Sequence, residues 1–152
     1  MKSIEEQIAD MRKYYYEFVA THQVANTCVW FGELRPYRKS YLIRIQYRVP
    51  LLPEMVSILH IQPRVQILNP ILEWHPEYEE GPIPHVYHNH ENVKLPFLCL
   101  FDPDVPEWSV DDSIALTTLP WVERWIVNYE FWLATGRWSG GGRHVSGRNL
   151  AA

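Results

Sequence analysis

One cysteine of this sequence lies in an apolar segment between two polar turns. Cys99 occupies the middle of residues 95–103, and three histidines precede it between residues 85 and 90. An acidic segment broken by prolines, beginning at Asp102, follows it. A thiol near histidines is a candidate nucleophile, because an imidazole can deprotonate the thiol or stabilise its thiolate. Most free cysteines are instead small buried hydrophobes, and composition alone favours that packing role.

The chemistry open to Cys99 depends on how much thiolate it carries. At the reference pKa of ~8.5, only about 3% of a cysteine is ionised at pH 7. That suffices for exchange with an activated thioester, whereas attack on an unactivated carbonyl calls for a neighbouring base or imidazolium. His85, His88 and His90 are the local candidates for that partner. Asp102 could orient the histidine or take a proton from an attacking amine, although Asp-Pro is also a common turn starter.

A metal site is an alternative use of the same residues. His85, His88, His90 and Cys99 could together ligate zinc. Their spacing matches no common zinc signature, and a second pair of closely spaced ligands is missing. We therefore expect no metal and no cofactor.

The composition limits the class of protein. The chain has 152 residues, of which 47% are hydrophobic and 14% aromatic, as expected for one domain with a real core. The formal charge of -4 with scattered arginines gives little support to nucleic-acid binding. No apolar run is long enough to span a membrane, and the N-terminus lacks the pattern of a signal peptide. Two distant cysteines argue against a disulfide framework, so a cytoplasmic location is the default.

Hydrophobic periodicity predicts an α+β fold. A helix over 3–20 and another over 120–135 should flank one face of an antiparallel sheet of about four strands. Pro120 suits a first helical turn, Gly136 ends the second helix, and its tryptophans should face the core. One domain is expected over 1–139, followed by a glycine-rich tail over 140–152. The segments predicted between the helices are strands 27–34 and 40–49, short β-like runs 56–61 and 64–68, a long loop 69–92, and a helical turn near 111–114.

The C-terminal third closely resembles a known family. The motif residues are Leu98-Cys99-Leu100-Phe101-Asp102-Pro103, then Pro120-Trp121, Trp125, Tyr129-Glu130, Trp132-Leu133, Thr135-Gly136, Trp138, Gly140-Gly141-Gly142 and His144. Together with the order of the elements, they resemble the bacterial ubiquitin-conjugating-enzyme-like proteins encoded in CBASS antiphage operons. The resemblance implies the ubiquitin-conjugating (UBC-like) fold. The length resembles that of the short, stand-alone type, which carries no fused activating domain.

The resemblance also implies a function. Such proteins resemble enzymes that carry an acyl group on cysteine, here Cys99, and pass it to an acceptor amine such as a protein lysine. The acyl donor would be the C-terminus of a cGAS-like nucleotidyltransferase, and a separate activating enzyme is a further possible partner. A UBC-like scaffold without catalysis is the alternative, and the retained Cys99 motif counts against it.

One feature departs from the eukaryotic conjugating enzymes. Those enzymes carry a His-Pro-Asn tripeptide before the cysteine, and its asparagine helps to stabilise the oxyanion. This sequence has no such tripeptide, and residues 85–87 occupy the corresponding place. His85 becomes the first candidate partner of Cys99, because its His-x-Tyr setting resembles the family motif. Asn89 and Asn92 lie nearer Cys99 and are candidates for the oxyanion role.

Overall fold

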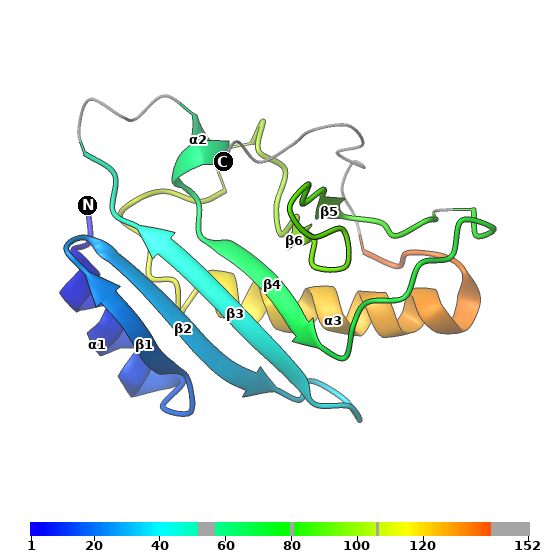
Figure 1. Ribbon diagram of the computed structural model, residues 1–152, viewed down its shortest axis with the longest axis horizontal. Helices are drawn as coiled ribbons and strands as arrows, with labels where there is room; N and C mark the ends of the chain where they lie inside the picture. The colour runs from blue at the N-terminus through cyan, green and yellow to red at the C-terminus, as the bar shows by residue number, and fades with distance from the viewer. Residues whose placement is uncertain (52–56, 80, 106, 141–152) are drawn as a thin grey trace.

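A meander of antiparallel strands forms the centre of the structure, and two long helices lie behind it in the view of Figure 1. The structure is a computed structural model that describes residues 1–51, 57–79, 81–105 and 107–140. The main sheet has the strand order β1-β2-β3-β4, and β5 pairs with β6 in a separate two-stranded sheet. The elements are α1 (Ile4–Tyr14), β1 (Val19–Val24), β2 (Thr27–Leu34), β3 (Tyr41–Arg48), α2 (Ile58–Ile61), β4 (Arg64–Asn69), β5 (Val86–Tyr87), β6 (Phe97–Leu98) and α3 (Thr118–Thr135). The predicted α+β class and four-stranded antiparallel sheet are confirmed.

The central strand β3 separates the core from the outer face of the sheet. Its alternate side chains Tyr41, Ile43, Ile45 and Tyr47 are buried, while the residues between them are half-buried. This is the alternation predicted for the strand over 40–49. The Tyr41 hydroxyl donates to Glu130 Oε1 at 2.9 Å, so the buried face of the sheet contacts α3.

The first helix is shorter than the sequence predicted. It begins with a capping box between Ser3 and Glu6 but ends at Tyr14, whereas we predicted helix to residue 20. Tyr15 takes an extended φ of -138°, and the chain turns there into β1. Phe18, the residue before β1, is buried and packs against Gly32, where any Cβ would lie 2.5 Å from its ring. The close packing of the Phe18 ring on Gly32 therefore accounts for the absence of helix after Tyr14.

Two smaller predictions also need correction. The run over 56–61 was predicted as β-like, but α2 is a short helix capped by the Ser57 side chain, which accepts from Leu59 N–H. Residue 56 itself lies outside the described residues. The helical turn predicted near 111–114 lies slightly later, where Thr117 N–H donates to Ser113 O at 3.0 Å. The tail expected over 140–152 lies outside the described residues except for Gly140.

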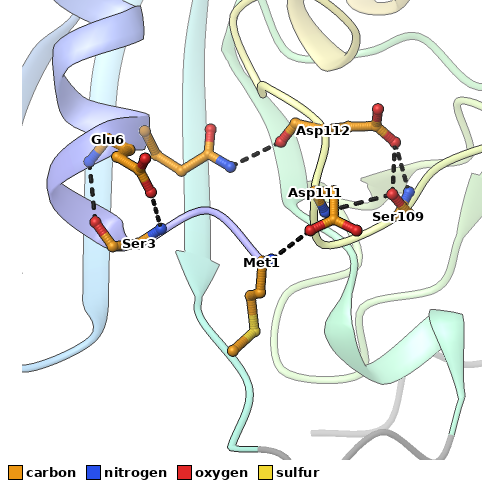
Figure 2. A network of polar contacts seen from close by, with 7 residues as sticks. Met1, Ser3, Glu6, Ser109, Asp111 and Asp112 are labelled. Atoms are coloured by element: carbon orange, nitrogen blue, oxygen red, sulfur yellow. Dashed lines mark hydrogen bonds and ion pairs between the residues drawn. The ribbon is translucent and has the colours of Figure 1, made fainter.

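A polar network fastens the N-terminus to the turn before α3 (Figure 2). Gln7 on α1 is fully buried, and its side chain donates to Asp112 O at 2.8 Å and accepts from Ile114 N–H at 3.0 Å. The Met1 amino group pairs with Asp111, and Ser109 donates to Asp112 Oδ2 from both its N–H and its hydroxyl. The bonds of Gln7 satisfy a buried polar side chain, and the network as a whole fixes where α3 starts.

The long loop after β4 packs along α3. Glu73 N–H donates to the Tyr129 hydroxyl at 2.8 Å, and Tyr78 donates to Leu133 O at 3.3 Å. The His75 ring stacks on Tyr78 and contacts a carboxylate at each nitrogen, and these hydrogen bonds to Glu73 and Glu77 raise its pKa. The first part of the loop predicted over 69–92 therefore packs against α3.

Trp125 and Trp132 of α3 are part of the core, as predicted, and truncation tests the contribution of Trp132. Trp132 is fully buried, whereas Phe131 beside it is 47% exposed. We expect Trp132→Ala to lower the free energy of unfolding by ~3–5 kcal/mol, because it leaves a large cavity. Phe131→Ala on the same helix should cost less than about 1 kcal/mol. Urea unfolding of both variants measures the difference, and equal losses would contradict the assignment of Trp132 to the core.

Candidate active site

The pairing of β5 with β6 places His85 opposite Cys99. The register joins Val86 to Leu98 and Tyr87 to Phe97, so the next pair along the ladder is His85 and Cys99. The Cys99 N–H donates to His85 O at 3.0 Å, which continues the ladder by one step. Residues opposite each other in an antiparallel pair lie close together. A cysteine and a histidine separated by 13 intervening residues are thus neighbours because two short strands pair.

His85 is held in an unusual backbone conformation. Its φ is +53°, which a residue with a side chain rarely adopts and which costs free energy unless its surroundings enforce it. Two hydrogen bonds to its carbonyl do so, since Trp125 Nε1–H donates to it at 2.9 Å in addition to Cys99 N–H. The His85 imidazole packs on Trp138, with ring centroids 4.8 Å apart. The backbone and the ring of His85 are therefore both fixed from α3 and the segment after it.

The Cys99 thiol is near the surface but narrowly enclosed. The residue is 6% exposed, and its Sγ lies 3.4 Å from the Tyr87 hydroxyl and 3.5 Å from Phe101 O. A tyrosine hydroxyl can accept from a thiol and donate to a thiolate, so Tyr87 can serve either form. Cys28 differs, because it lies fully buried inside β2 and burial raises the pKa of its thiol. The structure places Cys28 in the core.

A hollow of about 560 Å³ opens beside Cys99. It is lined by the sequence-predicted residues His85, Cys99 and Asp102, and by one stripe of α3. The stripe consists of Trp121, Arg124, Trp125 and Asn128. Their spacing of three and four residues puts these four side chains on one side of a helix. The remaining lining residues are Leu100, Phe101, Glu107, Trp138 and Gly140.

Asp102 and Asn89, the two other predicted site residues, have different surroundings. Asp102 lines the hollow, and its Oδ1 accepts from Asp104 N–H at 3.0 Å, which shapes the turn after the cysteine. Asn89 is absent from the lining residues. Its Nδ2 donates to Leu95 O at 3.0 Å and its Oδ1 accepts from Glu91 N–H at 3.1 Å. The Asn89 side chain thus holds together the loop that joins β5 to β6.

His88 and His90 are not among the residues that line the hollow. The His88 ring instead stacks on Trp74, with centroids 6.4 Å apart. Within the part of the chain that the structure describes, no three histidine, cysteine or carboxylate side chains gather in a group that could hold a metal ion. The alternative of a zinc site built from His85, His88, His90 and Cys99 therefore has no geometric support.

Sequence reasoning missed the contribution of α3 to the hollow. We had interpreted its tryptophans as core alone, yet Trp121 is only half-buried and contacts Phe101 at 5.5 Å between ring centroids. Arg124 and Asn128 attracted no attention, because an isolated polar residue on a helix is ordinarily solvated. Their spacing from Trp121 and Trp125 was the available signal. A second apolar stripe that continues into polar residues indicates a helix with two contacting faces.

Comparison with known proteins agrees with these features. Residues 7–145 match a family model described as Type II CBASS E2 protein. The match spans well over half of the chain and includes every residue that lines the hollow. No curated protein matches the chain. Over the described residues, no helix is long and apolar enough to cross a membrane.

Proposed function

Because the chain belongs to the Type II CBASS E2 family and so has a role in CBASS antiphage signalling, we propose that Cys99 carries an acyl group during that signalling. The acyl group is the C-terminus of a cGAS-like nucleotidyltransferase, and Cys99 passes it to an acceptor amine such as a protein lysine. The observation that carries the proposal is the position of Cys99, at the edge of a hollow that also contains a histidine, a carboxylate and an amide.

The proposed reaction has two steps. In the first, the Cys99 thiolate attacks the donor carbonyl and the Sγ–C bond forms. The bond from the carbonyl carbon to the leaving group breaks, and the leaving group takes up the proton that the thiol gave up to His85. In the second, a neutral amine attacks the thioester, the C–N bond forms, and Sγ leaves as a thiolate. Asp102 lines the hollow and receives the proton that the amine gives up. A separate activating enzyme supplies the donor as a thioester wherever the donor carboxylate is not already activated.

His85 is the proposed partner of the thiol. It lies opposite Cys99 at the end of the strand pair and lines the same hollow. An imidazolium at this position stabilises the thiolate, and a neutral imidazole accepts its proton. Backbone N–H groups or a side-chain amide facing the hollow stabilise the oxyanion. Asn89, our sequence-based choice for that amide, acts in this proposal by fixing the loop between His85 and Leu95.

The assignment of the nucleophile can be tested by covalent capture. The protein, the nucleotidyltransferase of the same operon and any activating enzyme encoded with them are incubated with ATP. We expect a product that links the nucleotidyltransferase to Cys99 and that thiols cleave. Cys99→Ala should abolish this product with little change in thermal stability, whereas Cys28→Ser should keep it and lower the stability. A linked product in the Cys99→Ala protein would contradict the assignment, and absence of any product from the wild type would favour a scaffold.

The role of His85 can be tested by the pH dependence of Cys99 alkylation with iodoacetamide. We expect the wild-type rate to titrate at a lower pH than that of an unperturbed cysteine, because the imidazolium favours the thiolate. His85→Ala should move the profile upward. His88→Ala and His90→Ala are matched controls outside the hollow and should leave it unchanged. If His85→Ala keeps the wild-type profile, His85 does not activate the thiol.

A further inference from the structure

We infer that Arg124 binds a carboxylate side chain in the C-terminal tail of the acyl donor. The inference rests on the proposed function, since it takes the hollow beside Cys99 as the place where the donor tail lies. Arg124 lines this hollow from α3, on the same stripe as Trp121, Trp125 and Asn128. The donor is thereby a polypeptide with an acidic residue close to its end.

The guanidinium of Arg124 is available to a ligand. Across residues 1–51, 57–79, 81–105 and 107–140 it makes no hydrogen bond and no ion pair, although Asp102 and Glu107 line the same hollow. Other charged residues on or after α3 do have partners: Glu123 accepts from the Tyr15 hydroxyl, and Arg137 lies 3.8 Å from Glu79. A planar guanidinium presents paired donors that match the two oxygens of a carboxylate.

Asn128 offers the tail a second contact one helical turn further along. Its Oδ1 accepts from the Ser139 hydroxyl at 2.8 Å, and the amide nitrogen of the same side chain takes no part in this bond. Gly140 lies against that nitrogen so closely that an added Cβ would be 2.5 Å from it. The Asn128 N–H groups can donate to a backbone carbonyl of an extended peptide, which holds the tail in place while Arg124 selects it.

The enclosure of Cys99 explains why the acidic group must lie upstream of the end. Tyr87 and Phe101 flank the sulfur and only 6% of the residue is exposed, so a slender terminal residue reaches it best. The terminal carbonyl carbon is bonded to Sγ in the thioester and no longer carries a free carboxylate. The anion that Arg124 binds is therefore a side chain of an earlier residue.

The charges of the hollow separate the two substrates. Arg124 lies on α3, whereas Asp102 and Glu107 belong to the segment that follows the cysteine. An anionic donor tail is attracted to the first side and the ammonium of an acceptor lysine to the second.

Synthetic peptide thioesters test the inference directly. The probes are acetylated tetrapeptides that end in glycine and carry a 2-mercaptoethanesulfonate thioester. One peptide has glutamine at all three positions before the glycine. Each of the others has a single glutamate in place of one of these glutamines. Transfer to Cys99 is followed by intact-protein mass spectrometry, and the small thiol leaves as the thioester exchanges. We expect the peptide with glutamate at one of the three positions to acylate Cys99 with a second-order rate constant about tenfold higher than that of the all-glutamine peptide. A charge-assisted contact with Arg124 implies a difference of this size. This preference should shrink at high salt.

Variants of the arginine complete the experiment. Arg124→Gln should remove the preference for glutamate over glutamine, and Arg124→Lys should retain part of it. Arg137→Gln, an exposed arginine outside the hollow, is the matched control and should keep the full preference. Equal reactivity of glutamate and glutamine peptides with the wild type overturns the inference but not the proposed function. Failure of every thioester to acylate Cys99 overturns both.

A further comparison separates a side-chain carboxylate from a terminal one. The all-glutamine peptide without its thioester is added as an inhibitor of transfer. It is used in two forms, one with a free C-terminal carboxylate and one with a C-terminal amide. Equal inhibition supports the assignment of Arg124 to a side chain. If the acid inhibits more strongly than the amide, and this difference disappears in Arg124→Gln, the arginine binds the terminal carboxylate. That result overturns the assignment to an upstream acidic residue.

Discussion

The carbonyl oxygen of His85 joins the parts of the site. It accepts one hydrogen bond from Cys99 N–H and a second from Trp125 Nε1–H, and these two donors come from the segment after β6 and from α3. Because His85 has a φ of +53°, its backbone would relax toward an ordinary conformation without such restraints. One carbonyl group thus fixes the distance between the thiol segment and the helix that forms the far wall of the hollow.

The rest of the fold serves to hold α3 in that position. The face of β3 that carries Tyr41 packs on α3, the loop after β4 bonds Tyr129, and the buried Gln7 anchors the turn that precedes the helix. These contacts are distant from Cys99, yet each limits how far α3 can shift. The proposed reaction uses a thiol, an imidazole and two polar residues in fixed relation, and a rigid scaffold of this kind favours it because misplacement of a reacting group slows the chemistry.

Local periodicity predicted much of the fold, but contacts between distant residues decided the rest. The alternation in β3 and the apolar stripes of α3 identified both elements, and the motif around Cys99 pointed to a segment that lines the hollow. Strand β1 was missed because its apolar spacing continues that of α1, and only the close fit of Phe18 on Gly32 breaks the helix. The hydrogen bond from Asn89 to Leu95 depends on how the loop folds, which no sequence pattern encodes. The position of Arg124 beside the hollow was signalled by its spacing from Trp121 and Trp125, but a pattern alone does not show which face of a helix borders a hollow.

The coupling of Cys99 to α3 through the His85 carbonyl is best measured by amide hydrogen exchange in a Trp125→Phe variant. The substitution keeps an aromatic ring but removes the indole N–H that donates to His85 O. If this bond restrains the segment, exchange at the Cys99 amide should accelerate by roughly tenfold, which is the effect of losing about 1.4 kcal/mol, while amides in β2 and β3 keep their protection. Trp121→Phe, which lines the hollow without such a bond, should leave the Cys99 amide unchanged. Unaltered protection at Cys99 in Trp125→Phe would contradict the account.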